Sequence, residues 1–364
     1  MEVKAAVLYE RGKEFVLDTV ELAEPKQDEV LIKIVASGIC HSDEVGRTFD
    51  GFSVLPVIMG HEGSGIVEKI GAGVKDLKPG DHVVVTYATC GTCKYCEDDM
   101  PTVCTSWTHL NSGGKMRDGT SRFSKDGKEV NNFFGYSSFT SHTVSHVRNV
   151  VKIDDDVDLS LMGPLGCGFQ TGAGTVLGYL DARPGKSFVV FGCGSVGLSA
   201  MMGAKIAGCN PIIAVGGTPD KLNLAKELGA THTINRREVG DIKGEIIKIT
   251  GGGADYVLDS TGNSEMIRIG IDAMGPLGKT ALVGVSDNIT IPVMNMMVKN
   301  QMVCAVTEGS VNYREFIPKM VAWYKEGRFP IDKLVKFYEF EDIEEAFSDS
   351  KSGQTIKPIL KMPK

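Results

Sequence analysis

The sequence predicts an α/β protein with two domains: a mainly antiparallel β domain and a doubly wound parallel sheet covered by helices. In the first third of the chain, short apolar runs alternate with turns, and no long helical pattern interrupts them. After about residue 170, runs typical of strands alternate with runs typical of helices, which indicates a parallel sheet. A chain of 364 residues is long enough to bury two hydrophobic cores.

The first domain begins with four apolar runs that have the length and composition of strands. They are residues 3–8, 30–35, 65–70 and 82–86, the last of which follows the turn Lys78-Pro79-Gly80-Asp81. Residues 139–151 predict further strand, and the polar, glycine-containing residues 111–132 predict a long surface excursion. From about residue 309, the chain shows a helical pattern at 318–325 and a strand at 356–360.

The second domain shows strand patterns at 188–191, 212–215, 256–258 and 280–283, and helical patterns at 198–207 and 219–228. Thr218 is suited to cap the second helix, because Pro219 then occupies its first position. Residues 187–215 are apolar enough to suggest a membrane span. They contain five glycines, Lys205 and Pro211, however, and they divide into strand, turn, helix and strand, so we interpret them as buried core.

The charge of the chain excludes some classes of partner. The formal net charge is −7, whereas binding to nucleic acid or to an anionic membrane needs concentrated Lys and Arg. The N-terminus lacks the pattern of a signal peptide, so we expect a cytoplasmic protein that acts on a small molecule. The chain has nine cysteines, and in such a protein clustered cysteines hold metal or do chemistry more often than they form disulfides.

Four of the cysteines lie within fifteen residues: Cys90, Cys93, Cys96 and Cys104, in the spacing C-x2-C-x2-C-x7-C. Short gaps bring neighbouring thiols to one side of a tight turn, and tetrahedral zinc accepts four thiolates. A ferredoxin-type iron–sulfur run has different gaps and a proline after its last cysteine. The spacing therefore predicts a structural zinc site, which has no open position for catalysis.

A catalytic zinc ion needs three protein ligands and an open position. The candidates are Cys40, His61 and Cys167, each of which lies near glycine, where the backbone can turn sharply. Each is a weak candidate by spacing alone, because a single buried cysteine is usually packing and a single histidine is usually an ordinary polar residue.

A glycine-rich motif, Gly192-Cys193-Gly194-Ser195-Val196-Gly197, follows a predicted strand and opens a predicted helix. In this context G-x-G-x-x-G is typical of a Rossmann dinucleotide-binding domain. The glycines allow the backbone to approach the pyrophosphate, which the helix N-terminus attracts. The alternative is a glycine-rich turn without a ligand.

Together these motifs resemble the zinc-containing medium-chain alcohol dehydrogenases along essentially the whole chain. The segments that occur in the order of that family are 60–62, the four-cysteine lobe, 71–74 with 79–81, and 166–172. The resemblance implies a GroES-like catalytic domain formed by residues 1–168 and 309–364, and a Rossmann domain formed by residues 169–308. It also implies two zinc ions per chain and a homodimer or homotetramer.

The resemblance further implies a role for individual residues. Cys40, His61 and Cys167 would bind the catalytic zinc, and Asp43 and Glu62 would orient the ligands. Ser42 would relay the alcohol proton toward the cofactor ribose. Some relatives end this relay at a histidine, but here that position is Val45, so the last step would use water. The remaining implied contacts are with the cofactor: His41 and Lys357 with the pyrophosphate, and Thr171, Val283, Gly284 and Val285 with the nicotinamide. The alternative for Lys357 is an ordinary exposed lysine.

The end of the second Rossmann strand departs from the pattern of relatives that prefer NAD(H). Those relatives carry an acidic residue there, but this chain has Gly216-Gly217-Thr218. Without that carboxylate, a 2′-phosphate would meet no repulsion and could bind Thr218, the backbone and Lys221. No arginine stands beside this segment in the sequence. We therefore predict a preference for NADP(H) over NAD(H).

Within the family, residues 133–139, 163–167, 308–310 and 327–330 are most similar to the aryl (benzyl-type) alcohol dehydrogenases. This predicts primary aromatic or allylic alcohols as substrates, with an aliphatic or terpenoid alcohol dehydrogenase as the alternative. Thr86 and Tyr87 would either line the substrate pocket or serve a structural role at the strand end.

Two further alternatives are an inactive zinc- and nucleotide-binding protein and a zinc-free quinone reductase. The first would lack one of the ligands or Ser42, and the second would lack the cysteine lobe, yet all are present. The other cysteines and two histidines are interpreted as ordinary structural residues: Cys193, Cys209, Cys304, His142 and His146.

Overall fold

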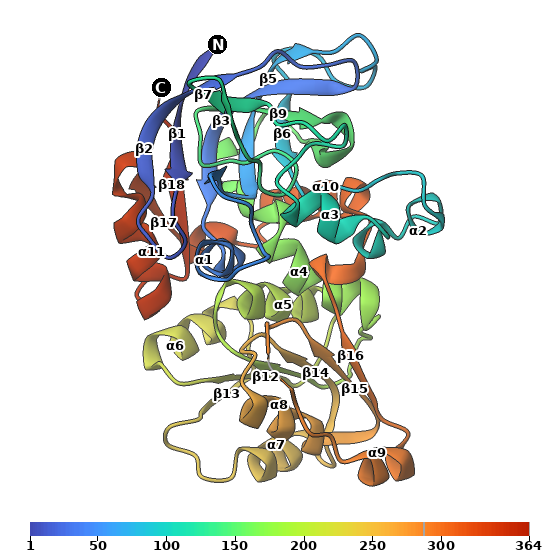
Figure 1. The fold of residues 1–364 in the computed structure, drawn as a ribbon. Coiled ribbons are helices and arrows are strands. Elements are labelled where there is room, and N and C mark those ends of the chain that lie inside the picture. The colour runs from blue at the N-terminus through green and yellow to red at the C-terminus, as the bar shows by residue number, and fades with distance from the viewer. Residues whose placement is uncertain (287, 364) are drawn as a thin grey trace. The chain divides into compact units, whose positions relative to one another are not determined.

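The computed structural model describes residues 1–286 and 288–363, which form two compact units (Figure 1). Unit 1 comprises Met1–Cys167, Asn312–Lys325 and Ile331–Lys364, and unit 2 comprises Gly168–Val311 and Glu326–Pro330. Within the described residues, no helix combines the length and the apolar character that a membrane crossing requires.

Unit 1 is built on two sheets. The first has the order β4-β1-β2-β7-β8 and the second β10-β6-β5-β3-β18-β17, with β9 paired to β3. All these pairings are antiparallel except that of β17 with β18, so the predicted antiparallel domain is confirmed. The strands are β1 (Glu2–Leu8), β2 (Val16–Leu22), β3 (Glu29–Gly38), β4 (Val57–Ile58), β5 (Glu62–Ile70), β6 (His82–Val85), β7 (Phe123–Lys125), β8 (Lys128–Val130), β9 (His142–His146), β10 (Val150–Lys152), β17 (Val335–Glu339) and β18 (Lys357–Lys361).

Five helices accompany these sheets: α1 (His41–Thr48), α2 (Lys94–Glu97), α3 (Trp107–Ser112), α10 (Tyr313–Lys325) and α11 (Ile343–Ser352). Helix α1 was not expected from the sequence, because eight residues with Gly46 inside are too few to show a helical period. Helix α10 begins at Tyr313 rather than near Pro318, which lies inside it.

The surface excursion expected for residues 111–132 is wrong for much of that segment. Its strands β7 and β8 form a hairpin that extends the first sheet beside β2. Arg122 is 3% exposed, and its Nε donates to the Glu29 carboxylate at 2.9 Å. Arg122 is thus paired inside the unit, which composition alone could not show.

Unit 2 contains a six-stranded parallel sheet in the order β13-β12-β11-β14-β15-β16. Numbered from β11, this is the 3-2-1-4-5-6 order of a doubly wound dinucleotide-binding fold, so the second predicted fold class is also confirmed. Its strands are β11 (Phe188–Phe191), β12 (Ile212–Gly216), β13 (His232–Asn235), β14 (Ala254–Asp259), β15 (Met274–Leu282) and β16 (Met302–Ala305).

Helices cover both faces of this sheet, with α5 and α6 on one side and α7 and α8 on the other (Figure 1). The helices of unit 2 are α4 (Gly168–Gly174), α5 (Ser195–Ile206), α6 (Pro219–Leu228), α7 (Ile242–Thr250), α8 (Ser264–Asp272) and α9 (Val293–Lys299). Short helical turns in the two units are η1 (Pro101–Val103), η2 (Val147–Asn149), η3 (Leu159–Leu161), η4 (Gly163–Gly166), η5 (Thr175–Tyr179), η6 (Glu308–Ser310), η7 (Ile331–Leu334) and η8 (Phe340–Asp342).

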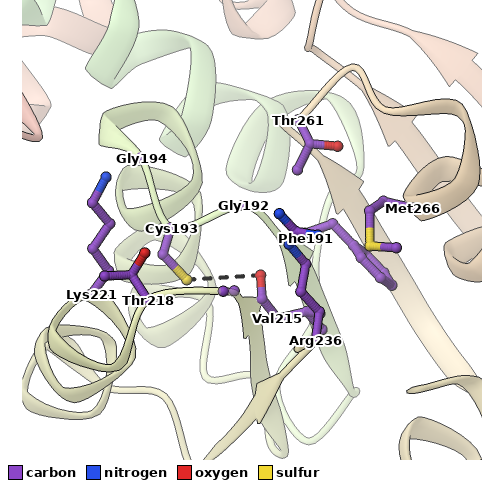
Figure 2. Close-up of a pocket in the computed structure, with 12 residues that line it drawn as sticks. Phe191, Gly192, Cys193, Gly194, Val215, Thr218, Lys221, Arg236, Thr261 and Met266 are labelled. Atoms are coloured by element: carbon purple, nitrogen blue, oxygen red, sulfur yellow. Dashed lines mark hydrogen bonds between the residues drawn. The ribbon is translucent and has the colours of Figure 1, made fainter. Parts of the chain in front are cut away.

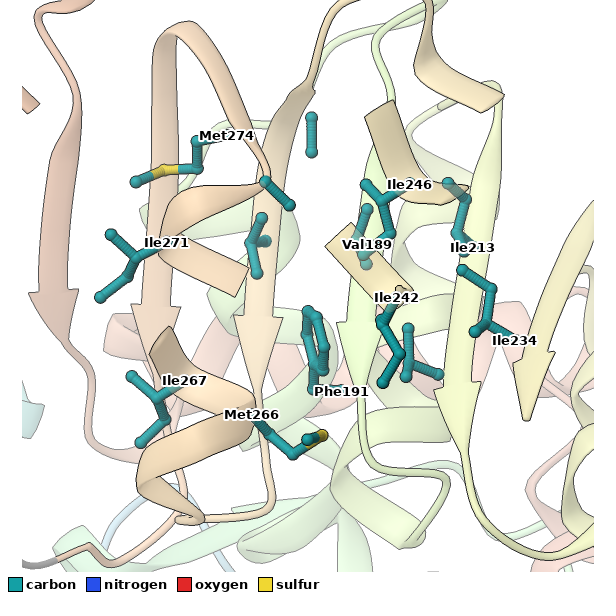
Figure 3. Packing of buried hydrophobic residues seen from close by; sticks show 14 residues of the cluster. Val189, Phe191, Ile213, Ile234, Ile242, Ile246, Met266, Ile267, Ile271 and Met274 are labelled. Carbon is teal, nitrogen blue, oxygen red and sulfur yellow. The ribbon is translucent and has the colours of Figure 1, made fainter. Parts of the chain in front are cut away.

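The core of unit 2 lies between the sheet and helices α7 and α8 (Figure 3). Val189 and Phe191 of β11 and Ile213 of β12 pack against Ile246 of α7 and Ile267 of α8, and each of these side chains is at most 1% exposed. Residues 187–215 are therefore buried core, as predicted. Because the strands are parallel, the carboxyl ends of β11, β12 and β14 lie at one edge, where a dinucleotide binds in such folds.

Candidate active site

Unit 1 brings together Cys40, His61 and Cys167, which come from three separate segments. Cys40 caps the N-terminus of α1, His61 lies immediately before β5, and Cys167 follows η4. One potential ligand atom from each, with one from Glu62, lies within 4.8 Å of the others. The neighbouring Cys167 thiol and His61 imidazole hold the pKa of Cys40 well below its ordinary value, although burial acts in the opposite direction.

Asp43 fixes the orientation of this cluster from the first turn of α1. One carboxylate oxygen accepts from the Cys40 N–H at 2.9 Å. The other accepts from His61 Nδ1 at 2.9 Å and from the Gly60 N–H at 3.2 Å. Asp43 is 0% exposed, and its contact with Nδ1 leaves Nε2 as the ring nitrogen that could bind a metal ion.

The donor atoms of this cluster fit zinc. His61 Nε2 is buried and has no hydrogen-bond partner in the described part of the chain. Such an atom is costly unless a ligand satisfies it. Two thiols and one imidazole are also donors that zinc prefers, and three protein ligands would leave one coordination position open. Phe134 stacks on the His61 ring at 4.4 Å and Phe133 meets it edge-on, which holds the imidazole in place.

Lys357, which was predicted to contact the pyrophosphate, is buried beside Glu62. Its Nζ donates to both carboxylate oxygens of Glu62, at 2.9 and 2.8 Å, and to the Ile39 carbonyl at 3.1 Å. Lys357 is 2% exposed. In unit 1 this ammonium is paired with the buried Glu62 carboxylate beside the cluster, and its contact with a pyrophosphate stays a prediction.

The other two residues expected at this site from α1 are less enclosed. Ser42 is half-buried in the first turn of α1, and His41 is exposed beside it. Thr86 donates to the Gly166 carbonyl at 2.5 Å and is fully buried. Tyr87 is 1% exposed and meets the ring of Tyr313 edge-on at 5.0 Å. The contact of Thr86 favours the structural alternative, because it fixes the loop that carries Cys167.

The second cysteine cluster also forms as the spacing predicts. Sulfurs of Cys90, Cys93, Cys96 and Cys104 lie within 4.8 Å of one another, and those of Cys90 and Cys96 are 4.0 Å apart. Tetrahedral zinc with bonds of about 2.3 Å separates its sulfurs by about 3.8 Å. The four thiols therefore fit a closed zinc site with only a small contraction.

In unit 2, the glycine-rich motif opens onto a pocket at the carboxyl ends of the central strands (Figure 2). Gly192 has φ +100°, and a Cβ on Gly197 would lie 1.9 Å from the Gly192 carbonyl oxygen, so both positions require glycine. Ser195 and Val196 begin helix α5 beside them. The pocket is lined by Phe191, Gly192, Cys193, Gly194, Val215, Gly216, Gly217, Thr218, Lys221, Arg236, Thr261 and Met266.

Two arginines near this pocket were missed at the level of sequence. Arg236 follows β13, and its N–H donates to the Gly216 carbonyl at 2.8 Å. A Cβ on Gly217 would lie 3.1 Å from Arg236 Nε and 3.3 Å from Arg237 Nε. In the folded chain, two arginines therefore do lie beside Gly217, although none is adjacent to it in the sequence. The strand order could have revealed it, because β13 pairs with β12 and places its end beside the end of β12.

Three residues predicted to contact the nicotinamide lie in unit 2 but do not line this pocket. Thr171 is half-buried in α4, Val283 is half-buried after β15, and Val285 is 73% exposed. Their contact with a cofactor stays a prediction.

The remaining cysteines and histidines largely follow their interpretation. Cys193 and Cys209 are buried, whereas Cys304 is half-buried on β16, which corrects the expectation that all three are buried. His142 and His146 lie on β9, and neither belongs to the two potential metal clusters found among the described residues.

Comparison with known proteins identifies the family. Residues 26–155 match the model of the alcohol dehydrogenase GroES-like domain, and residues 195–326 match that of the zinc-binding dehydrogenases. The chain belongs to the zinc-containing medium-chain alcohol dehydrogenase family, so the predicted family is confirmed and the chain is an alcohol dehydrogenase.

Individual relatives match the chain over essentially its full length. A geraniol dehydrogenase from Castellaniella defragrans is 41% identical over 99% of this chain and 98% of its own. The crystal structure of an alcohol dehydrogenase zinc-binding domain protein from Burkholderia ambifaria has a TM-score of 0.98 at 43% identity. That of a benzyl alcohol dehydrogenase from Acinetobacter calcoaceticus has a TM-score of 0.96 at 42% identity, and both structures cover 100% of each chain.

Proposed function

We propose that this enzyme interconverts primary aromatic or allylic alcohols and their aldehydes by direct hydride transfer with a nicotinamide cofactor. The observation that carries the proposal is the cluster of Cys40, His61 and Cys167, with its buried and unpartnered His61 Nε2. Two relatives support the substrate class: one is named a benzyl alcohol dehydrogenase and the other a geraniol dehydrogenase. Both names denote a primary alcohol next to an unsaturated carbon.

We assign different roles at this site to different residues of unit 1. When zinc is bound by Cys40, His61 and Cys167, it supplies Lewis acidity toward an alcohol or carbonyl oxygen. Asp43 contacts Nδ1 of His61 and would thereby leave Nε2 to bind the metal. We assign to Ser42 Oγ the transfer of the alcohol proton. Val45 follows on the same helix and cannot continue a relay, so water would take the proton from there.

Substitution of Ser42 tests the proton transfer. Ser42→Ala is expected to lower turnover by about 10²-fold or more, as loss of general acid–base catalysis does, while zinc content stays unchanged. Ser42→Thr is the matched control, because it keeps the hydroxyl. Equal turnover of the alanine variant and the wild type would reject this role for Ser42.

The alternative is an aliphatic or terpenoid alcohol dehydrogenase, and the name of the geraniol relative supports a terpenoid substrate. The test is to compare kcat/KM for benzyl, cinnamyl, geranyl and ethyl alcohols. The proposal expects benzyl and cinnamyl alcohol to be preferred over ethanol. A preference for ethanol would overturn it, whereas a preference for geraniol over both aromatic alcohols would keep the allylic class, reject the aromatic one and favour a terpenoid substrate.

We further propose that the cofactor is NADP(H). Among the described residues that line the pocket, none carries a carboxylate, and Lys221 and Arg236 supply positive charge instead. Burial lowers the pKa of Lys221, so an anion beside it would stabilise its charged form. Arg237 lies next to Gly217 as well. Arginine forks suit phosphate, which supports binding of a 2′-phosphate at Gly217 and Thr218.

The ratio of kcat/KM for NADP(H) and NAD(H) tests this preference. Arg236→Leu is expected to lower that ratio by about tenfold, the size of one lost charge-assisted hydrogen bond. Arg268→Leu is the control, since this arginine of α8 pairs with Asp272 on the same helix. A wild-type enzyme that clearly prefers NAD(H) would defeat the proposal.

We also infer that the enzyme is a homo-oligomer in which unit 2 meets a second copy. Helix α9 contains no buried residue and exposes large apolar side chains, among them Val293, Met294, Met297 and Val298. Beside it, β16 ends the sheet, and a terminal strand can pair with the same strand of a copy. Light scattering should show at least a dimer, and Met297→Glu should shift it toward monomer. A monomeric wild type would overturn the inference.

A further inference from the structure

The turn that follows β14 also contributes to the wall of the cofactor pocket. This turn contains Ser260, Thr261 and Gly262, and it follows Asp259, the last residue of the strand. Thr261 lines the pocket together with Gly192 of the glycine-rich motif (Figure 2).

The Asp259 side chain holds this turn. One carboxylate oxygen accepts from the N–H groups of Thr261 and Gly262, at 3.0 and 2.9 Å. The other accepts from the Thr261 hydroxyl at 2.8 Å. Asp259 is 1% exposed, and among the described residues no cation forms a salt bridge with it. Burial raises the pKa of its carboxyl, and the hydrogen bonds from the turn act in the opposite direction. Its charge is therefore stabilised by the turn that it positions.

The same turn also fixes Gly192, the first glycine of the motif. The Ser260 hydroxyl donates to the Phe191 carbonyl at 3.0 Å, immediately before Gly192. Thr261 Oγ1 also accepts from the Asn263 N–H at 3.0 Å, so its rotamer is held from two sides. A Cβ on Gly192 would lie 3.0 Å from the Thr261 methyl. The methyl thus packs against the point at which the motif turns.

The same turn contacts the end of β15. The Val283 N–H donates to the Asp259 carbonyl at 2.9 Å. A Cβ on Gly262 would lie 2.0 Å from the Val285 carbonyl oxygen, so the two backbones are in close contact. Asp259 therefore links the carboxyl ends of β11, β14 and β15 at the edge where a dinucleotide lies.

We propose that Asp259 is a positioning residue for the nicotinamide cofactor, which it serves by holding Thr261 against Gly192. The inference rests on the assignment of this pocket to the cofactor, but not on the choice between NADP(H) and NAD(H). Its side-chain hydrogen bonds all lie within the turn, and the turn meets the motif through the Ser260 hydroxyl and the Thr261 methyl, so Asp259 acts on the part of the site that both cofactors share.

The test measures the Kd of the reduced cofactor by fluorescence titration of the full-length, zinc-loaded enzyme. The probe is whichever of NADPH and NADH the wild type binds more tightly. Asp259→Ala leaves three donors without their acceptor, and we expect Kd to rise about tenfold or more. Asp259→Asn keeps one oxygen acceptor and can donate to Thr261 Oγ1, so it should rescue part of the affinity. Zinc content should not change in either variant.

The matched control is Asp255→Ala at the opposite end of β14. Asp255 also accepts three hydrogen bonds: from Lys186 Nζ, the Ser187 N–H and the Ser187 hydroxyl. Its loss should lower the melting temperature without changing Kd. If Asp259→Ala lowers the melting temperature in the same way and leaves Kd unchanged, Asp259 is merely structural and the proposal is overturned.

Asp259→Asn and a further variant, Thr261→Val, keep the test decisive if Asp259→Ala does not fold. Thr261→Val keeps the methyl and removes the hydroxyl, and it should weaken cofactor binding as Asp259→Asn does. Unchanged Kd in both variants would overturn the proposal. A wild type that prefers NADH would reject the NADP(H) proposal and leave the role of Asp259 measurable, whereas a wild type that binds neither cofactor would overturn both.

Discussion

Replacing Asp43 by asparagine tests how far the metal site depends on one buried carboxylate. Asp43 accepts three hydrogen bonds, from the backbone of Cys40 and Gly60 and from His61 Nδ1. An asparagine offers one oxygen in place of two, so its amide group would face at least one of these donors. The substitution preserves the size and shape of the side chain and removes its charge.

The expected magnitude follows from these contacts. One buried donor left without an acceptor costs about 1–3 kcal/mol. Loss of the carboxylate that orients a ligating histidine weakens metal binding by about 10–100-fold, or about 1.4–2.8 kcal/mol. Asp43→Ala would abandon all three donors and cost up to about 9 kcal/mol, which approaches the whole stability of a typical domain. Asparagine is therefore the informative substitution.

The assay is chelator competition, with zinc per chain determined by elemental analysis. We expect Asp43→Asn to lose zinc at a chelator concentration about 10–100-fold lower than the wild type requires. Asp50→Asn is the control, because the Asp50 side chain is 97% exposed. If Asp43→Asn releases zinc at the wild-type chelator concentration, the orienting role of this carboxylate is refuted.

Three other predictions address the rest of unit 1. Cys104→Ser should remove one zinc ion per chain and lower the melting temperature, and a variant with the zinc content of the wild type would contradict the closed thiolate site that we propose for these cysteines. Gly60→Ala should destabilise the enzyme by about 1–3 kcal/mol and weaken zinc binding, because Gly60 has φ +85° and its added Cβ would lie 2.7 Å from the Phe139 nitrogen. If the variant unfolds at the same urea concentration as the wild type, this prediction is refuted. Burial, assisted by the positive charge of Arg117, lowers the pKa of His146 from 6.5 to about 4. Between these two values the unfolded chain binds a proton that the folded chain does not, so stability falls as the pH decreases. His146→Gln should therefore lose less unfolding free energy than the wild type as the pH decreases from 6.5 to about 4, as measured by urea titration. The same pH dependence of the unfolding free energy in both proteins would contradict this prediction.

The sequence predicts those parts of the molecule that depend on local pattern. The alternation of strands and helices indicates the doubly wound unit, and the spacing of Cys90 to Cys104 indicates their cluster, because both patterns lie within short stretches of chain. Helix α1 is too short to show a period, although it carries Ser42 and Asp43 and begins directly after Cys40. Its N-terminus is stabilised by the hydrogen bond from the Cys40 N–H to Asp43, which composition does not reveal.

Residues that act through tertiary pairing are harder to predict. Arg236 reaches Gly217 only because β13 pairs with β12, and nothing near Gly217 in the sequence indicates this. Lys357 resembles an exposed lysine near the end of the chain, but β18 pairs with β3 and brings it to Glu62. In both cases strand order determines the contact, so a prediction of topology must precede a prediction of the site.

Asp43 and Asp259 show where the boundary between local and tertiary information lies. Aspartate is rarely fully buried, and each of these carboxylates is stabilised by three donors. All donors to Asp259 lie two or three residues ahead, a pattern typical of an Asp turn that the sequence Asp-Ser-Thr-Gly already permits. Asp43 instead joins a local donor at Cys40 to donors at Gly60 and His61, so it couples the start of a helix to the histidine that we propose binds zinc. Substitution of Asp259 should therefore disturb one turn and the affinity for the cofactor, whereas substitution of Asp43 should disturb two segments and both zinc binding and folding.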